Sequence, residues 1–146
     1  MKAIAPGDDP RQIFGAVPFT RLLGVQRPFS ENGRAQLVIE PRAELGNVIG
    51  AMHGGVVMTL LDVVMASAAV SQREFSCTAV TLHLDSTFLE PGRGRLTADG
   101  EVLHHDEHIA HCRASVTDGE GRVVAQGLGS FRYLPYPAPK TPGDTP

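Results

Sequence analysis

The stretch GAMHGGVVMTLLDVVMASAAV, residues 50–70, decides the fold of this chain. It opens with His-Gly-Gly and continues as an apolar run that carries a single acid, Asp62. At about 100° per residue, the bulky Val57, Leu60 and Val64 fall on one side of a helix, where they can pack against a sheet. The spacing therefore predicts one long helix with a sheet on its apolar side.

The opposite side of this helix, which we expect to span residues 54–71, carries small side chains. They are Gly55, Thr59, Asp62, Ala66 and Ala69, and Met58 and Met65 flank them. Asp62 can be a solvated side chain, part of a helix contact with a second copy of the chain, or a functional group in a desolvated site. A buried carboxylate is costly unless it is paired or used. No other Asp, Glu, Lys or Arg lies between Met52 and Gln72, whereas an exposed helix face of that length usually carries several charges.

The His-Gly-Gly at the start of the helix suggests a chemical role for its backbone. The first N–H groups of a helix lack an acceptor and carry the positive end of its dipole. Gly54 and Gly55 would let a ligand approach them, which makes an oxyanion hole for a carbonyl under attack. Together with a carboxylate base, such a hole suggests acyl transfer. His53 and Asp62 are nine residues apart, so they could meet across a symmetric dimer but not along one helix.

Alternating patterns predict strands on both sides of the helix. The turn Asn32-Gly33 indicates a hairpin before residues 34–40, whose Ala35, Leu37 and Ile39 share one face. Four further strands are expected at residues 77–89, 95–104, 108–117 and 122–134. In the first of these, Val80, Leu82, Leu84 and Phe88 are expected on one face. The fold class is therefore α+β, with one central helix on a single antiparallel sheet of five to six strands.

Composition limits the organisation and the partners of the chain. Its 146 residues suggest one domain at residues 17–134, between a flexible N-terminal segment (1–16) and a proline-rich disordered tail (135–146). The net charge of −3 without a basic cluster argues against a nucleic-acid partner. The apolar run 56–70 is too short for a bilayer and contains an acid, and no apolar leader is evident, so the cytoplasm is expected.

The cysteines and histidines do not form an expected metal site. The two cysteines, Cys77 and Cys112, lack ligand spacing and are interpreted as reduced, buried side chains. His104, His105, His108 and His111 lie around a hairpin turn, where adjacent side chains point in opposite directions. No metal is therefore expected.

Four segments in order resemble a known family. They are PFTRLLGV (18–25), NVIGAMHGG (47–55), HGGVVMTLLD (53–62) and VTLHLDSTFLEPGRG (80–94). The set resembles hotdog-fold acyl-CoA thioesterases of the PaaI-like, phenylacetic-acid-degradation type. The resemblance implies a hotdog fold in which two copies pair edge to edge as a homodimer, and pairs join as a homotetramer.

The resemblance also implies roles for individual residues. Gly54 would offer its N–H to the thioester oxygen, with Asn47 and His53 helping to position the ester. Asp62 of the other copy would act as general base or nucleophile, and the hydroxyl of Thr81 would help to hold water. Residues expected at the substrate or CoA are Gly55, His83, Phe88, Arg93 and His104.

The activity that these roles imply is hydrolysis of an acyl-CoA to free acid and CoA. A thiolate with a pKa of roughly 8.5 leaves without a strong acid, so no metal or redox cofactor is needed. Two alternatives stay open: a non-catalytic acyl-CoA-binding or regulatory hotdog module, and a hotdog hydratase. The hydratase ranks lower because its Asp and His motif is not found.

Overall fold

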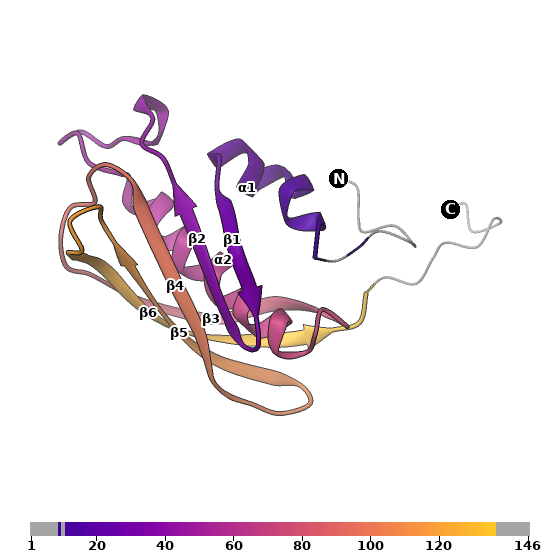
Figure 1. The fold of residues 1–146 in the computed structure, drawn as a ribbon. Coiled ribbons are helices and arrows are strands. Elements are labelled where there is room, and N and C mark those ends of the chain that lie inside the picture. The colour runs from indigo at the N-terminus through magenta and orange to yellow at the C-terminus, as the bar shows by residue number, and fades with distance from the viewer. Residues whose placement is uncertain (1–8, 10, 137–146) are drawn as a thin grey trace, which may run out of the picture.

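One long helix, α2 (Gly54–Gln72), lies against a single antiparallel sheet of six strands in the computed structural model (Figure 1). The structure describes residue 9 and residues 11–136. The strands are β1 (Gln26–Glu31), β2 (Arg34–Ile39), β3 (Thr78–Phe88), β4 (Leu96–His105), β5 (Ile109–Thr117) and β6 (Val123–Leu134). Their order in the sheet is β1-β2-β4-β5-β6-β3, which leaves β1 and β3 at the edges. The α+β class and the hotdog arrangement are confirmed.

The core lies between α2 and the covered face of the sheet. Val57, Leu60 and Val64 are at most 2% exposed, as their spacing predicted. Ala35, Leu37 and Ile39 of β2 face them from the sheet and are equally buried. Removal of this apolar surface from water is the main force that holds the helix on the sheet.

The small-residue side of α2 is partly accessible but becomes buried toward the C-terminal end of the helix. Ala69 is fully buried, and the hydroxyl of Tyr133 donates to its carbonyl oxygen at 3.0 Å. Met65 is fully buried too, so it belongs to the core and does not flank an open surface as expected. The accessible part of this side therefore runs from Gly55 to Ala66.

Gly100 of β4 allows α2 to lie close to the sheet. A Cβ atom at this position would lie 2.9 Å from the carbonyl oxygen of Val64 and 3.0 Å from its carbon. Helix backbone cannot yield easily, so Gly100→Ala is expected to lower the free energy of unfolding by about 1–3 kcal/mol, measured by urea denaturation. Gly119→Ala is the matched control, because no heavy atom lies within 4 Å of its added Cβ. An equal loss in both variants would contradict the packing explanation.

The predicted domain, residues 17–134, lies within the described residues, and the two segments expected to flank it extend beyond them. Residues 1–8 and 10 of the expected flexible segment, and residues 137–146 of the expected tail, lie outside them. Within the segment, Ile13–Ala16 forms a short 3-10 helix, η1, ahead of helix α1 (Pro18–Leu23). A second short 3-10 helix, η2, spans Ala43–Leu45. Phe14 packs on the core, and the Arg27 guanidinium lies 4.6 Å from its ring centroid, so this part of the segment contacts the domain.

Helix α2 is long and apolar enough to cross a membrane, which corrects the expectation that its apolar run is too short. Of its most apolar window, 56% is buried within the described fold. The core helix of a soluble protein passes the same test, so its hydropathy is explained by packing against the sheet.

The two cysteines are free and buried, as predicted. Cys112 lies on β5 and is 1% exposed. Burial raises the pKa of its thiol to about 12, so it stays a neutral, packed side chain at ordinary pH.

Candidate active site

The edge strand β3 contains a bulge that decides where its side chains point. Thr81 pairs with Phe131 and His83 pairs with Ser130, so Leu82 is an extra residue between them. Phe131 is fully buried beneath α2, and Thr81 shares its face because paired residues point the same way. The bulge therefore turns Thr81 toward α2 and His83 away from it.

The bulge also corrects the predicted apolar face of this strand. Val80 is 43% exposed and Leu82 is 53% exposed, so they do not share the covered face with Leu84. Strict alternation fails here because one inserted residue reverses the face of everything before it.

Asp62 and Thr81 meet within one chain. The Thr81 hydroxyl donates to Asp62 Oδ1 at 2.6 Å, from the bulged edge strand to the middle of α2. The Asp62 side chain is half-buried. This contact holds the carboxylate through one oxygen, and Oδ2 accepts no protein hydrogen bond within residues 11–136.

The start of α2 has one amide without an acceptor. His53 caps the helix: its Nδ1 accepts from the Gly55 N–H at 2.9 Å. Its carbonyl oxygen accepts from Val56 at 2.9 Å and from Val57 at 3.2 Å. Across residues 11–136, the remaining amide of this turn, that of Gly54, donates to no protein acceptor. The positive end of the helix dipole thus presents a single N–H.

The two glycines at this end differ in what they are needed for. A Cβ at Gly55 would lie 3.1 Å from His53 Nδ1, so the cap itself favours glycine there. A Cβ at Gly54 would meet only the ring of Phe88 at 3.7 Å, an ordinary contact. Packing therefore does not require glycine at position 54.

Two loops meet beside this amide. Asn47 Oδ1 accepts from the N–H groups of Ile49 at 3.1 Å and Ala51 at 3.0 Å, which shapes the loop before α2. Arg93, from the loop after β3, donates to the carbonyl oxygens of Gly50 at 3.0 Å and Ile49 at 3.4 Å. The guanidinium of Arg93 therefore joins the two loops.

A pocket of about 300 Å³ opens between these loops and includes Gly54. Its lining is mostly apolar: Ile49, Met52, Val57, Phe88, Leu89 and Val124. The structure thus brings together the predicted Asn47, His53, Gly54 and Phe88. Ile49, Leu89 and Glu90 were not predicted from the sequence, because this wall forms only where two loops distant in sequence meet.

Two predicted substrate residues lie on the other face of the sheet. His83 pairs with Ser130, whose Oγ lies 3.0 Å from His111 Nδ1, and the His111 and His104 rings stack at 6.4 Å. His83 and His104 are therefore not brought to Asp62 or Gly54. No three His, Cys, Asp or Glu side chains among the described residues form a set that could hold a metal ion.

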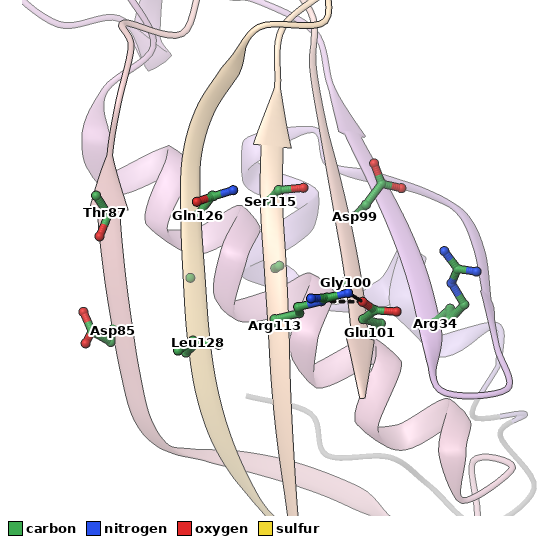
Figure 2. A pocket seen from close by; sticks show the side chains of 12 residues that line it. Arg34, Asp85, Thr87, Asp99, Gly100, Glu101, Arg113, Ser115, Gln126 and Leu128 are labelled. Carbon is green, nitrogen blue, oxygen red and sulfur yellow. Dashed lines mark hydrogen bonds and ion pairs between the residues drawn. The ribbon is translucent and has the colours of Figure 1, made fainter. Parts of the chain in front are cut away.

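The same outer face carries a larger groove of about 610 Å³, which the sequence did not predict. Figure 2 shows its polar side chains on the face that α2 does not cover, with Arg113 paired to Glu101. This groove contains neither Asp62 nor the start of α2. Its polarity follows from the outward positions of ordinary strand alternation, so it is not the candidate active site.

The two halves of the candidate site cannot serve one substrate within one chain. Gly54 and Asp62 are eight residues apart on one straight helix. At about 1.5 Å per residue they lie ~12 Å apart along the axis. A carbonyl held by the Gly54 amide is therefore out of reach of the Asp62 of the same chain.

One long helix on a six-stranded antiparallel sheet is the hotdog fold, and an unbonded amide and a carboxylate on that helix are groups that a hydrolase uses. A model of the thioesterase superfamily matches residues 49–125, which contain both halves of the site. The chain belongs to the thioesterase superfamily, and the family resemblance found in its sequence is confirmed.

Individual relatives agree with this placement. A protein of Saccharolobus solfataricus that carries the provisional name of esterase is 30% identical over 105 residues, covering 71% of this chain and 74% of its own. A thioesterase family protein from Silicibacter pomeroyi superposes with a TM-score of 0.81 at 25% identity, covering 86% of this chain and 96% of its own. The E. coli PaaI protein, from the phenylacetic acid degradation operon, shares the fold with a TM-score of 0.78 at 23% identity, covering 85% and 89%.

Proposed function

We propose that this chain is an acyl-CoA thioesterase whose active site is shared between two copies. The observation that carries the proposal is the division of the site on α2. One end offers an unbonded amide at Gly54, and Asp62, held by Thr81, lies ~12 Å further along. The amide can hold the carbonyl oxygen of a thioester, and the carboxylate can activate the water that attacks it. Within one chain the two groups are too far apart to act on the same thioester.

The exposed edge of β3 supports pairing of two copies. Val80, Leu82 and Phe88 are 43%, 53% and 49% exposed along this strand. An open edge with apolar side chains favours pairing with another strand. A two-fold axis perpendicular to β3 would make the two α2 helices run in opposite directions, so that Gly54 of one copy faces Asp62 of the other. We propose this homodimer, alone or as half of a homotetramer.

The reaction then follows from the two groups. The thioester oxygen accepts the Gly54 N–H, and the helix dipole stabilises the negative charge that develops on it. Asp62 of the second copy takes a proton from water, whose oxygen attacks the carbonyl carbon. The C–S bond breaks, the thiolate leaves, and the proton held by Asp62 passes to it. Direct attack by the carboxylate on the carbonyl carbon is the other route that this geometry permits.

The proposal is tested by a thiol-release assay across a panel of acyl-CoA esters of differing chain length and aromaticity. We expect release of CoA with at least one ester at a kcat/KM of about 10⁴ M⁻¹s⁻¹ or higher, within the usual range for enzymes. Binding of the esters without any thiol release would contradict the proposal and would favour the acyl-CoA-binding module.

A further inference from the structure

The pocket beside Gly54 has one ionisable side chain among the residues that line it, Glu90. Resting on the proposed function, we infer that this pocket takes the acyl group and that Glu90 selects against acyl groups with a free carboxylate. The acyl group belongs here because the pocket adjoins the amide that would hold its carbonyl. The pantetheine arm carries polar amides and must reach solvent, which an apolar wall does not favour.

The floor of the pocket is built from the protein core. Met52, Val57 and Val124 are 8%, 2% and 1% exposed. A carboxylate that enters such a wall loses water without gaining a hydrogen-bond donor. An uncharged aliphatic or aromatic group instead gains apolar contact, so the floor by itself already favours uncharged acyl groups.

The backbone that carries Glu90 is fixed at the mouth of this pocket. The N–H groups of Leu89 and Glu90 both donate to the carbonyl oxygen of Val124, at 2.9 Å and 3.2 Å. The loop after β3 is therefore held on β6, directly above a residue of the pocket floor. The backbone of Glu90 is therefore held at the rim of the pocket, and its side chain is exposed there.

The negative charge of Glu90 is not paired directly with a cation among the described residues. Arg122 interacts electrostatically with Glu90, which helps to raise the pKa of Arg122. Its guanidinium, however, forms ion pairs with Asp118 at 2.8 Å and with Glu120 at 3.1 Å. Arg93 keeps its charge, but its guanidinium is held away from Glu90 by the carbonyl oxygens of Gly50 and Ile49 and forms no ion pair with Glu90. An anionic acyl group would therefore meet a like charge that no direct ion pair neutralises.

The test compares two esters of the same chain length, hexanoyl-CoA and adipoyl-CoA, which differ by a terminal carboxylate. The quantity measured is the ratio of kcat/KM for adipoyl-CoA to that for hexanoyl-CoA, after subtraction of spontaneous hydrolysis. We expect the wild type to prefer hexanoyl-CoA. Glu90→Gln should raise the ratio by about five- to tenfold, and Glu90→Lys should raise it further, as expected for removal and reversal of a nearby charge.

Glu107→Gln is the matched control, because it makes the same change in net charge at an exposed acid in the turn between β4 and β5. A ratio that Glu90→Gln leaves within about twofold of wild type would overturn the inference, and so would an equal rise in Glu107→Gln, since surface charges beyond a Debye length are screened. Hydrolysis of hexanoyl-CoA in those cases leaves the proposed function standing. No thiol release with any ester contradicts the proposed function, and the inference falls with it.

Discussion

Asp62→Asn is expected to lower kcat for thioester hydrolysis by about 10²–10⁴-fold, the usual contribution of a general base. An amide cannot take up the proton of the attacking water or act as a nucleophile. It keeps the shape of the carboxylate, and its oxygen can still accept the Thr81 hydroxyl, which lies at 2.6 Å from Asp62 in the wild type. The fold and the affinity for acyl-CoA are therefore expected to persist, as measured by thermal denaturation and by calorimetric titration.

Asp99→Asn provides the control for this variant. Asp99 lies on β4, on the outer face of the sheet, and accepts from Gln36 Nε2 at 2.9 Å. The same chemical change there should leave turnover close to wild type. Wild-type turnover in Asp62→Asn would contradict the role of Asp62, whereas comparable losses in both variants would indicate a general effect of charge.

Most of the fold could be predicted because it follows from local patterns. The 3.6-residue period of α2 and its flanking alternation depend only on neighbouring side chains. Asn32 and Gly33 adopt φ values of 50° and 75°, which the hairpin before β2 requires and which these residue types tolerate. The part of the site at the start of α2 could be predicted for the same reason, since His53 caps the glycines directly after it in the sequence.

The bulge at Leu82 could not be predicted, because it depends on pairing rather than on local sequence. Nothing in the run Thr81, Leu82, His83 differs from ordinary alternation. The insertion accompanies two pairings with distant residues, since Thr81 reaches Asp62 and His83 pairs with Ser130. The pocket beside Gly54 could not be predicted for the same reason, because its rim forms where Arg93 joins two loops that are distant in sequence.

Gly54→Pro is expected to remove the proposed oxyanion donor without unfolding the helix. Position 54 is the first residue of α2, where proline is favoured, and His53 at φ −60° and ψ 137° has the extended backbone that suits a residue before proline. The lost N–H makes no hydrogen bond within the described chain, and the added Cβ meets only Phe88 at 3.7 Å. We expect kcat to fall by about 10²–10³-fold, as for loss of one oxyanion donor. Gly54→Ala keeps the amide and is the matched control.

Mixing the two inactive variants gives the largest recovery that a shared site allows. A mixed dimer contains one site built from the native Asp62 of the Gly54→Pro copy and the native Gly54 of the Asp62→Asn copy; its other site has lost both groups. When equal amounts of the two variants are refolded together, random reassociation makes about half of the dimers mixed. Each mixed dimer has one intact site of two, so about a quarter of wild-type activity should return, although each variant alone is almost inactive. A site contained in one chain predicts no recovery at any mixing ratio. The measured dependence of activity on that ratio therefore decides whether Gly54 and Asp62 act on the same thioester from two copies.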